Sequence, residues 1–304
     1  MLRIRKILYP TDYSASAGRA LIHALYLAHR YGAELHMLHV QVPHEDDPHN
    51  PEHRFPPREA VLEKLVAFAG TQASGRPPVD GLVIRQVERR EVTAAPAIVE
   101  YAADEAVDLI VMGTHGRRGV RHLLAGSVTE EVVRMAPCAV LSVRGEQTPA
   151  SLAEIRHVLA PVDFSDDSKE ALLVASEIAG GYEADLQVLH VWENVLHPAF
   201  YNMGAASIKD LQPDIEERTM KALRALVEAA DGFGGRAEYF AVEGHAAREI
   251  VSFASENETD LIVIATHGLT GLDHFLLGSV SEKIVRRAPC PVLVVKRKHT
   301  LLPH

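Results

Sequence analysis

The stretch DLIVMGTHGRRGVRHLLAGSVTEEVVRMAPCAVLSVR, residues 108–144, decides the fold because the chain repeats it. The second copy is DLIVIATHGLTGLDHFLLGSVSEKIVRRAPCPVLVVK, residues 260–296, with 22 identities in 37 ungapped positions. Upstream, ILYPTDYS (7–14) matches VLAPVDFS (158–165), and AELHMLHV (33–40) matches ADLQVLHV (184–191). The two copies begin at residues 108 and 260, so the repeat is about 150 residues long. That is the size of a domain, whereas a solenoid unit is much shorter. The sequence therefore predicts domains at 1–144 and 155–298, joined by a linker at 145–154.

Composition and charge narrow the class of protein. The 304 residues are 47% apolar and 24% charged, which is typical of a globular chain. The formal net charge of −10 argues against nucleic-acid binding, which needs a basic surface. We find neither a secretory signal nor an apolar run of the roughly 18 residues that span a membrane. Cys138 and Cys290 occupy equivalent positions, which favours a packing role. We expect a cytoplasmic protein that contacts no membrane.

Each repeat alternates strand-like and helix-like patterns. In the first repeat the predicted strands are 5–9, 33–40, 82–87, 108–113 and 139–143. The predicted helices are 14–32, about 58–73, 94–106 and 127–136. This alternation predicts an α/β fold of two tandem Rossmann-like domains. Each domain should be a five-stranded parallel sheet with helices on both faces.

Local signals set the helix ends. Ser14 or Ser16 can cap the first helix, and Gly32 should end it. One face of that helix should be buried, formed by Leu21, Ala24, Leu25 and Ala28. Ser127 with Glu130 three residues on reads as a capping box at the last helix.

The loop between the fourth strand and the last helix is rich in glycine. Gly113, Gly116 and Gly126 lie between a strand end and a helix start, where ligands bind in such sheets. Backbone N–H groups of that helix, with the hydroxyls of Ser127 and Thr129, would form an anion cradle. We expect a positive φ at Gly126. The loop lacks the P-loop pattern and its lysine. A turn with no ligand is the alternative.

Other polar residues leave more than one interpretation open. Asp12 and Asp163 could hold a metal with phosphates, cap a helix or contact a ribose. His115 and His267 are better explained as loop hydrogen-bonding groups than as catalytic bases. The histidine-rich segment 44–53 could bind metal, but it lacks tight zinc spacing and favours a solvated loop. We therefore predict no catalytic residue and no protein metal site.

At this point the motif resembles a known one. The pattern Gly-x-x-Gly, nine residues, then Gly-Ser is similar to the nucleotide motif of the universal stress protein family. The segments YPTDYS and PCAVLSVR also resemble that family, and the resemblance covers nearly the whole chain. It implies ATP binding, with or without Mg²⁺. In the first domain the implied residues are Pro10, Thr11, Asp12, Val40, Met112, Gly113, His115, Gly116, Gly126, Ser127, Val128 and Thr129. In the second they are Asp163, Val191, His267, Gly268, Gly278, Ser279, Val280 and Ser281.

The two predicted sites differ. The first loop carries Arg117, Arg118 and Arg121, whereas the second has none of these and adds Asp273. Position 265 is Ala where the first copy has Gly113, and its methyl group could crowd a phosphate or block the required backbone angle. Against this, Val92 stands where the second copy has Gly244. We expect the first site to bind ATP more tightly.

The function expected from these observations is a nucleotide-dependent regulatory module in stress adaptation. Two alternatives stay open: a slow ATPase or nucleotidyl-transfer enzyme, and a scaffold that binds no nucleotide. The fifth strands, AVLSV and PVLVV, are apolar and should pair within the chain as a pseudo-dimer. A homodimer is left open.

Overall fold

A computed structural model of the chain describes residues 2–42, 60, 81–114, 126–144, 155–193, 212–229, 234–267, 277–296 and 301. In the first half the strands are β1 (Lys6–Pro10), β2 (Glu34–Gln41), β3 (Ile84–Arg90), β4 (Leu109–Gly113) and β5 (Ala139–Val143). The helices there are α1 (Ala15–Tyr31), α3 (Ala94–Asp104) and α4 (Ser127–Met135). In the second half the strands are β6 (His157–Pro161), β7 (Asp185–Trp192), β8 (Ala237–Glu243), β9 (Leu261–Ala265) and β10 (Val292–Val295). The helices there are α5 (Asp166–Tyr182), α8 (Ile215–Ala229), α9 (Ala246–Glu256) and α10 (Ser279–Arg287).

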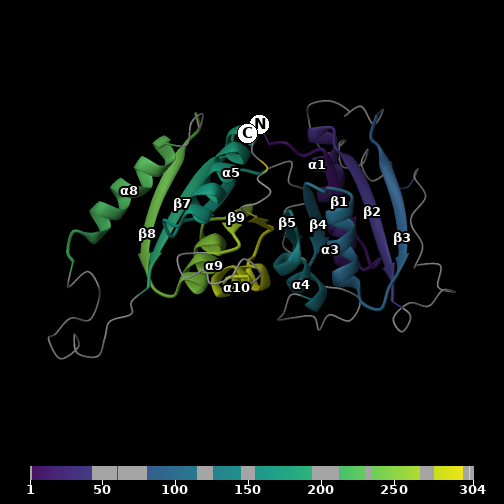
Figure 1. Ribbon diagram of the computed structural model, residues 1–304. Coiled ribbons are helices and arrows are strands. Elements are labelled where there is room, and N and C mark those ends of the chain that lie inside the picture. Colours follow the sequence, from purple (N-terminus) through teal and green to yellow (C-terminus); the bar gives the residue numbers. More distant parts are fainter. Residues whose placement is uncertain are drawn as a thin grey trace.

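The described strands form one ten-stranded sheet, in the order β3-β2-β1-β4-β5-β10-β9-β6-β7-β8 (Figure 1). Within each half all neighbouring strands are parallel. The α/β fold with two five-stranded parallel sheets is therefore confirmed. The order in each half reverses direction between its first and fourth strands, as in doubly wound sheets.

Helices cover both faces of the sheet because strand side chains alternate between two apolar layers. Ile7 and Tyr9 of β1 pack in the layer that contains α1, α5 and α8. Leu8 between them packs in the layer that contains α3, α4, α9 and α10. Continuous apolar strands of this kind are typical of parallel sheets buried on both sides.

Helix α1 forms as its sequence predicts. Ser14 is its N-cap, and the Ser14 hydroxyl accepts a hydrogen bond from the Ala17 N–H. Gly32 ends the helix in the left-handed conformation with φ 62°, which glycine adopts without strain. The predicted apolar face is buried, with Leu21, Ala24, Leu25 and Ala28 at most 3% exposed.

Strand β3 and helix α3 differ most from their predicted bounds, and three predicted segments lie outside the described residues. Strand β3 begins at Ile84 rather than 82 and continues to Arg90, and α3 ends at Asp104 rather than 106. The predicted capping box is wrong, because the N-cap of α4 is Gly126 and Ser127 is the first helical residue. The linker 145–154, the loop 44–53 and, apart from Ala60, the helix 58–73 lie outside the described residues.

The two halves join through their fifth strands. β5 and β10 pair antiparallel, so that the apolar edge of each half is covered by the other. Two basic side chains cross the joint in equivalent ways. Lys296 donates to the carbonyl of Val133 at 2.7 Å, near the end of α4, and Arg144 donates to that of Ala288 at 3.3 Å, after α10. Cations at helix carboxyl ends neutralise the partial negative charge there.

One ion pair connects the two last helices without a counterpart on the other side. Arg286 of α10 donates to the Glu130 carboxylate of α4, with the nearer nitrogen 2.7 Å away. The equivalent Arg134 is exposed. Among the described helices, none is both long and apolar enough to cross a membrane.

Candidate functional site

The strand order of each half reverses between its first and fourth strands, and doubly wound sheets have their ligand crevice at this point, beyond the carboxyl ends of the strands. β1 and β4 are paired at Ile7–Leu109 and Leu8–Ile110, and the described strands show no further pair between them. By contrast, β1 pairs with β2 at five positions and β4 with β5 at five. The carboxyl ends of β1 and β4 therefore diverge. The second half repeats this with β6 and β9, which pair at Val158–Leu261 and Leu159–Ile262.

The amino end of α4 follows this crevice along the chain, and no side chain among the described residues caps it. Its N-cap is Gly126, and the equivalent N-cap of α10 is Gly278. The first N–H groups of a helix lack intrahelical partners and carry partial positive charge. Ser127 is exposed and Val128 is 36% exposed, so this end of α4 is accessible. The amino ends of α1 and α5 differ, because Ser14 and Ser165 cap them.

The backbone angles of the N-cap glycines are open to any residue, but at Gly278 the backbone approaches closely. Gly126 has φ −63° and Gly278 has φ −58°, so the expected positive φ at Gly126 is wrong. The Gly278 N–H donates to the Thr266 carbonyl at 2.8 Å, and a Cβ at Gly278 would lie 3.0 Å from that oxygen. Gly126 makes the equivalent short hydrogen bond to Thr114. A side chain at Gly278 would therefore require a small shift of the helix away from the strand end.

The buried hydroxyls of the first helical turn also fasten the helix to the strand end. Thr129 donates to the Gly113 carbonyl at 2.9 Å, and Ser281 donates to the Ala265 carbonyl at 2.8 Å. Both side chains are buried. Since each hydroxyl proton is committed to a carbonyl, the exposed Ser127 and Ser279 are the hydroxyls left near the helix end.

Gly113 and Ala265 differ for a reason that the sequence did not show. Neither has a positive φ, so the prediction that the Ala265 methyl would block a required backbone angle is wrong. Instead, a Cβ at Gly113 would lie 2.8 Å from the backbone carbon and oxygen of Ser16 in α1. The glycine lets α1 pack against the end of β4.

The turn after the first strand of each half holds a carboxylate in place. The Asp12 carboxylate accepts a hydrogen bond from the Ser14 N–H at 3.0 Å, and Asp163 accepts one from the Ser165 N–H at 3.0 Å. Between them, Tyr13 and Phe164 are left-handed, with φ 63° and 66°. That conformation costs a residue other than glycine roughly 1–2 kcal/mol. Strain of this kind often marks ligand sites.

Asp12 and Asp163 were open to three interpretations: a metal ligand, a helix cap or a ribose contact. In the structure each aspartate accepts a hydrogen bond in the turn that leads into a serine-capped helix. Among the described residues there is no group of three or more His, Cys, Asp or Glu side chains arranged to hold a metal.

The remaining predicted residues are placed as follows. Pro10, Val40 and Met112 are buried and Thr11 and Val191 are half-buried, all at or just beyond the carboxyl ends of β1, β2, β4 and β7. Val280 is half-buried in the first turn of α10. His267 lies after β9 with its Nδ1 3.1 Å from the Thr266 hydroxyl. The predicted positions outside the described residues are His115, Gly116, Arg117, Arg118, Arg121, Gly268 and Asp273.

Two residues missed at the sequence level also reach the crevice. His39 of β2 lies 2.8 Å from the Thr11 carbonyl, and His190 of β7 lies 2.6 Å from the Val162 carbonyl, in each case through Nδ1. The signal was present as the shared LHV of both second strands. An apolar strand pattern predicts which residues are buried, but it does not predict the hydrogen-bond partner of a histidine within it.

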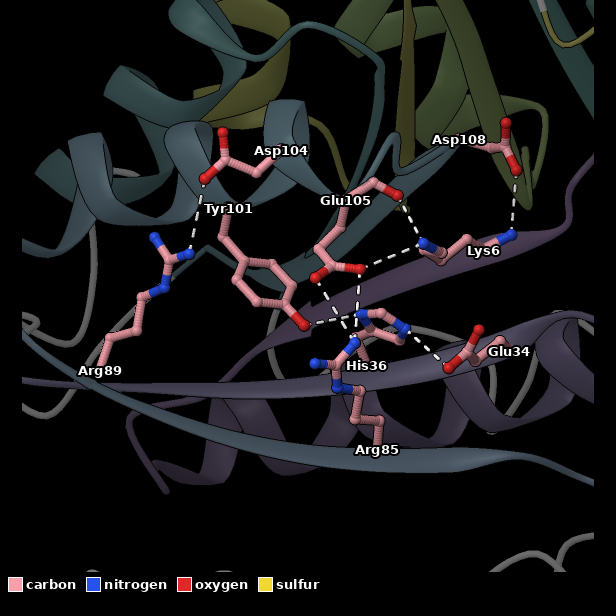
Figure 2. A network of polar contacts seen from close by, with 9 residues as sticks. All are labelled: Lys6, Glu34, His36, Arg85, Arg89, Tyr101, Asp104, Glu105 and Asp108. Atoms are coloured by element: carbon pink, nitrogen blue, oxygen red, sulfur yellow. Dashed lines mark hydrogen bonds and ion pairs between the residues drawn. The ribbon is translucent and has the colours of Figure 1, made fainter.

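A second cluster of titratable residues lies at the opposite, amino ends of the strands in the first half (Figure 2). His36 of β2 has a fully buried side chain whose Nδ1 is 2.7 Å from the Tyr101 hydroxyl of α3. Its Nε2 lies 3.0 Å from the Glu34 carboxylate, a close electrostatic contact without hydrogen-bond alignment. Lys6 donates to the Glu105 carboxylate at 3.3 Å, and that hydrogen bond lowers the pKa of Glu105.

The second half lacks the buried histidine and its tyrosine partner, although Asp185 stands at the position of Glu34. Gln187, Phe253 and Thr259 occupy the positions of His36, Tyr101 and Val107. The Thr259 hydroxyl donates to the Gln187 side chain at 3.2 Å. A buried histidine at this position of the second strand therefore belongs to the first half alone.

The two cysteines take no part in either cluster. Both are free and buried, and burial raises the pKa of the Cys138 and Cys290 thiols to about 12. Such thiols are unreactive at neutral pH, in line with a packing role.

Comparisons with known proteins agree with the duplication. The model of the universal stress protein family matches residues 3–144 and again residues 154–296. A universal stress protein of Methanocaldococcus jannaschii is 36% identical over 143 residues, which are 47% of this chain and 82% of that protein. One of Mycolicibacterium smegmatis is 27% identical over 219 residues, 71% of this chain and 70% of that protein. A solved universal stress protein of Archaeoglobus fulgidus, 19% identical, has the same fold with a TM-score of 0.64, covering 96% of this chain and 98% of that one.

Replacing Gly113 by alanine should destabilise the first half. The new Cβ would meet Ser16 backbone atoms at 2.8 Å, and backbone cannot rotate aside as a side chain can. We expect Gly113→Ala to lower the free energy of unfolding by about 1–3 kcal/mol in urea titrations. As a control, Gly18→Ala lies in α1 with no atom within 4 Å of its Cβ and should stabilise by about 0.5–1 kcal/mol. Equal stability of Gly113→Ala and the wild type would contradict this account.

Acid should weaken the first half through His36. Burial lowers the pKa of His36 below its usual value, and the neighbouring Glu34 only partly opposes this shift. The unfolded chain therefore binds a proton at this histidine more readily than the folded chain does. The contribution of His36 to the free energy of unfolding is fully present above about pH 6.5 and is lost as the pH falls below that value. The variant His36→Gln/Tyr101→Phe/Val107→Thr reproduces the residues of the second half.

Urea titrations at pH 7.5 and 5.5 test this expectation. The loss of stability on acidification should be smaller in the triple variant than in the wild type. Buried His23, whose pKa burial lowers to about 4, is present in both proteins, so the difference isolates His36. An equal loss in the two proteins would show that His36 does not carry the effect.

Proposed function

The chain belongs to the universal stress protein family in both of its halves, and on that basis we propose that it binds adenine nucleotide, ATP, at the two crevices. In this proposal the bound nucleotide sets the state of a regulatory module that acts in stress adaptation. The protein would work in the cytoplasm, and its net charge of −10 disfavours nucleic-acid partners.

One observation carries the proposal. In both halves, the helix that begins after the crevice has a glycine N-cap, whereas the helix that follows the first strand is capped by its own serine. The α4 and α10 ends thus keep backbone N–H groups that an anion can accept from. Phosphate is the anion that such helix ends commonly bind.

The proposed ligand contacts follow the strand ends. Phosphates would lie against the first turns of α4 and α10 and the glycine loops, with Ser127 and Ser279 as donors. The adenosine would lie along Pro10, Thr11 and Asp12, with Val40 and Met112 beside the base. If Mg²⁺ accompanies ATP, the phosphates and Asp12 would hold it, since carboxylate and phosphate oxygens suit that ion.

The two sites are proposed to be unequal, with the first one tighter. The first turn of α1 contains no acidic residue, whereas that of α5 contains Asp166 and Asp167. Both helices begin next to a crevice, directly after the Asp12 and Asp163 turns. A carboxylate near a triphosphate disfavours its binding, and more so where water is excluded.

The joint gives a route from nucleotide to regulation. α4 is nine residues long, so about 13 Å separates its ends. Its amino end is the proposed phosphate site, and near its carboxyl end Lys296 of the other half binds the Val133 carbonyl. A shift of α4 on nucleotide binding would therefore reach the second half directly.

A carboxylate at the start of α4 should block the first site. Ser127→Asp places a negative charge beside the N–H groups and should lower ATP affinity at least about tenfold. The fold should hold, because acidic residues in a first helical turn stabilise it. Isothermal titration calorimetry on Ser127→Asp and on the uncharged control Ser127→Asn measures the difference.

The matched variant Ser279→Asp assigns the second site. It should leave the strongest ATP-binding event unchanged and remove only a weaker one. If Ser127→Asp binds ATP as the wild type does, the helix end is not the phosphate site. If Ser279→Asp alone removes the strong event, the ranking of the two sites is wrong.

A further inference from the structure

His39 and His190 connect the second strand of each half to the turn that carries the aspartate. The Nδ1 of His39 is 2.8 Å from the Thr11 carbonyl, and that of His190 is 2.6 Å from the Val162 carbonyl. The residue after each carbonyl is the aspartate, Asp12 or Asp163. Each histidine therefore binds the backbone immediately before the carboxylate proposed to lie beside the nucleoside.

The geometry also fixes which imidazole nitrogen carries a proton. A carbonyl oxygen only accepts, so Nδ1 must be the donor in both histidines. Burial lowers the pKa of His190 below its usual value, which keeps this ring neutral at physiological pH. Each ring acts as a fixed N–H donor to the turn.

Each ring also packs against the left-handed residue of the turn. The centroids of His39 and Tyr13 are 4.5 Å apart, and those of His190 and Phe164 are 4.8 Å apart. Tyr13 and Phe164 are the residues with φ 63° and 66°. The same side chain thus holds the strained residue by its ring and the preceding backbone by its nitrogen.

The two halves share this arrangement although the surrounding residues differ. Thr11 in the first half corresponds to Val162 in the second, and Tyr13 corresponds to Phe164. The histidine, the aspartate and the left-handed angle are common to both. The aspartate accepts the N–H of the helix-capping serine in both halves. The features common to both halves are therefore the ones that fix the orientation of the aspartate carboxylate.

We infer that His39 and His190 are positioning residues, which hold the turns after β1 and β6 so that Asp12 and Asp163 face the nucleoside of a bound nucleotide. This inference rests on the proposed function. It adds to each site a residue that does not touch the ligand and acts through the turn.

The test compares two replacements at each histidine in the full chain. His39→Leu removes the donor, whereas His39→Asn keeps an N–H donor near the position of Nδ1. We expect His39→Leu to speed hydrogen exchange of the Ser14 amide and to weaken ATP binding at the first site about tenfold. His39→Asn should restore both measurements toward wild type. His190→Leu should affect Ser165 exchange and leave the first site unchanged.

The exchange measurement needs no nucleotide, which separates this inference from the proposed function. Unchanged Ser14 exchange in His39→Leu would overturn the inference. So would faster exchange with unchanged ATP affinity, because the turn would then not position the ligand. A failure of His39→Asn to restore either property would show that the donor is not what acts. If the wild type binds no ATP, the proposed function and the positioning role both fail.

Discussion

The short pairing of β1 with β4 is the constraint on which the rest of each half depends. The two strands meet over two positions and then diverge, while each stays fully paired with its outer neighbour. Ligands of doubly wound sheets bind beyond the carboxyl ends of strands that part in this way. Close backbone approach adds a second constraint, because a Cβ at Gly113 would meet Ser16 and a Cβ at Gly278 would meet the Thr266 carbonyl. The proposed ligand site thus depends on strand order and on close backbone approach.

The joint between the halves extends this arrangement into one body. β5 and β10 complete a single sheet, and Lys296 and Arg144 each bind carbonyls at the end of the other half's last helix. The Arg286–Glu130 pair adds a contact that has no symmetric partner in the described part of the chain. A protein built by duplication therefore has two similar halves and an asymmetric connection between them.

Much of the fold could be predicted because the chain contains each element twice, so that a strand or helix pattern in one copy could be compared with the other. The Ser14 cap, the Gly32 stop and the apolar face of α1 depend on local sequence alone, and the structure has all three. The reason for each loop glycine could not be predicted. A sequence shows that Gly126 is glycine, but only the structure shows that its φ is negative and that its N–H donates to the Thr114 carbonyl.

The clusters that depend on tertiary contacts were also beyond the sequence. His36 is far along the chain from Tyr101 and Glu105 and meets them only when α3 packs on the sheet. His39 lies in an apolar strand pattern, which predicts a buried position but not a contact with the turn after β1. Its hydrogen bond, worth about 0.5–1.5 kcal/mol, and its ring contact, of similar size, together match the roughly 1–2 kcal/mol cost of the left-handed Tyr13. Contacts worth this much free energy can fix the conformation of a turn, although neither the composition nor the periodicity of the sequence indicates them.

The central claim is that the uncapped amino end of α4 receives the phosphates of a nucleotide. Amide chemical shifts of the ¹⁵N-labelled chain during ATP titration test it most directly. The account predicts the largest changes at the Ser127, Val128 and Thr129 amides, with small changes at the serine-capped start of α1. Largest changes at the amino ends of the strands around His36, or no changes at all, would contradict it.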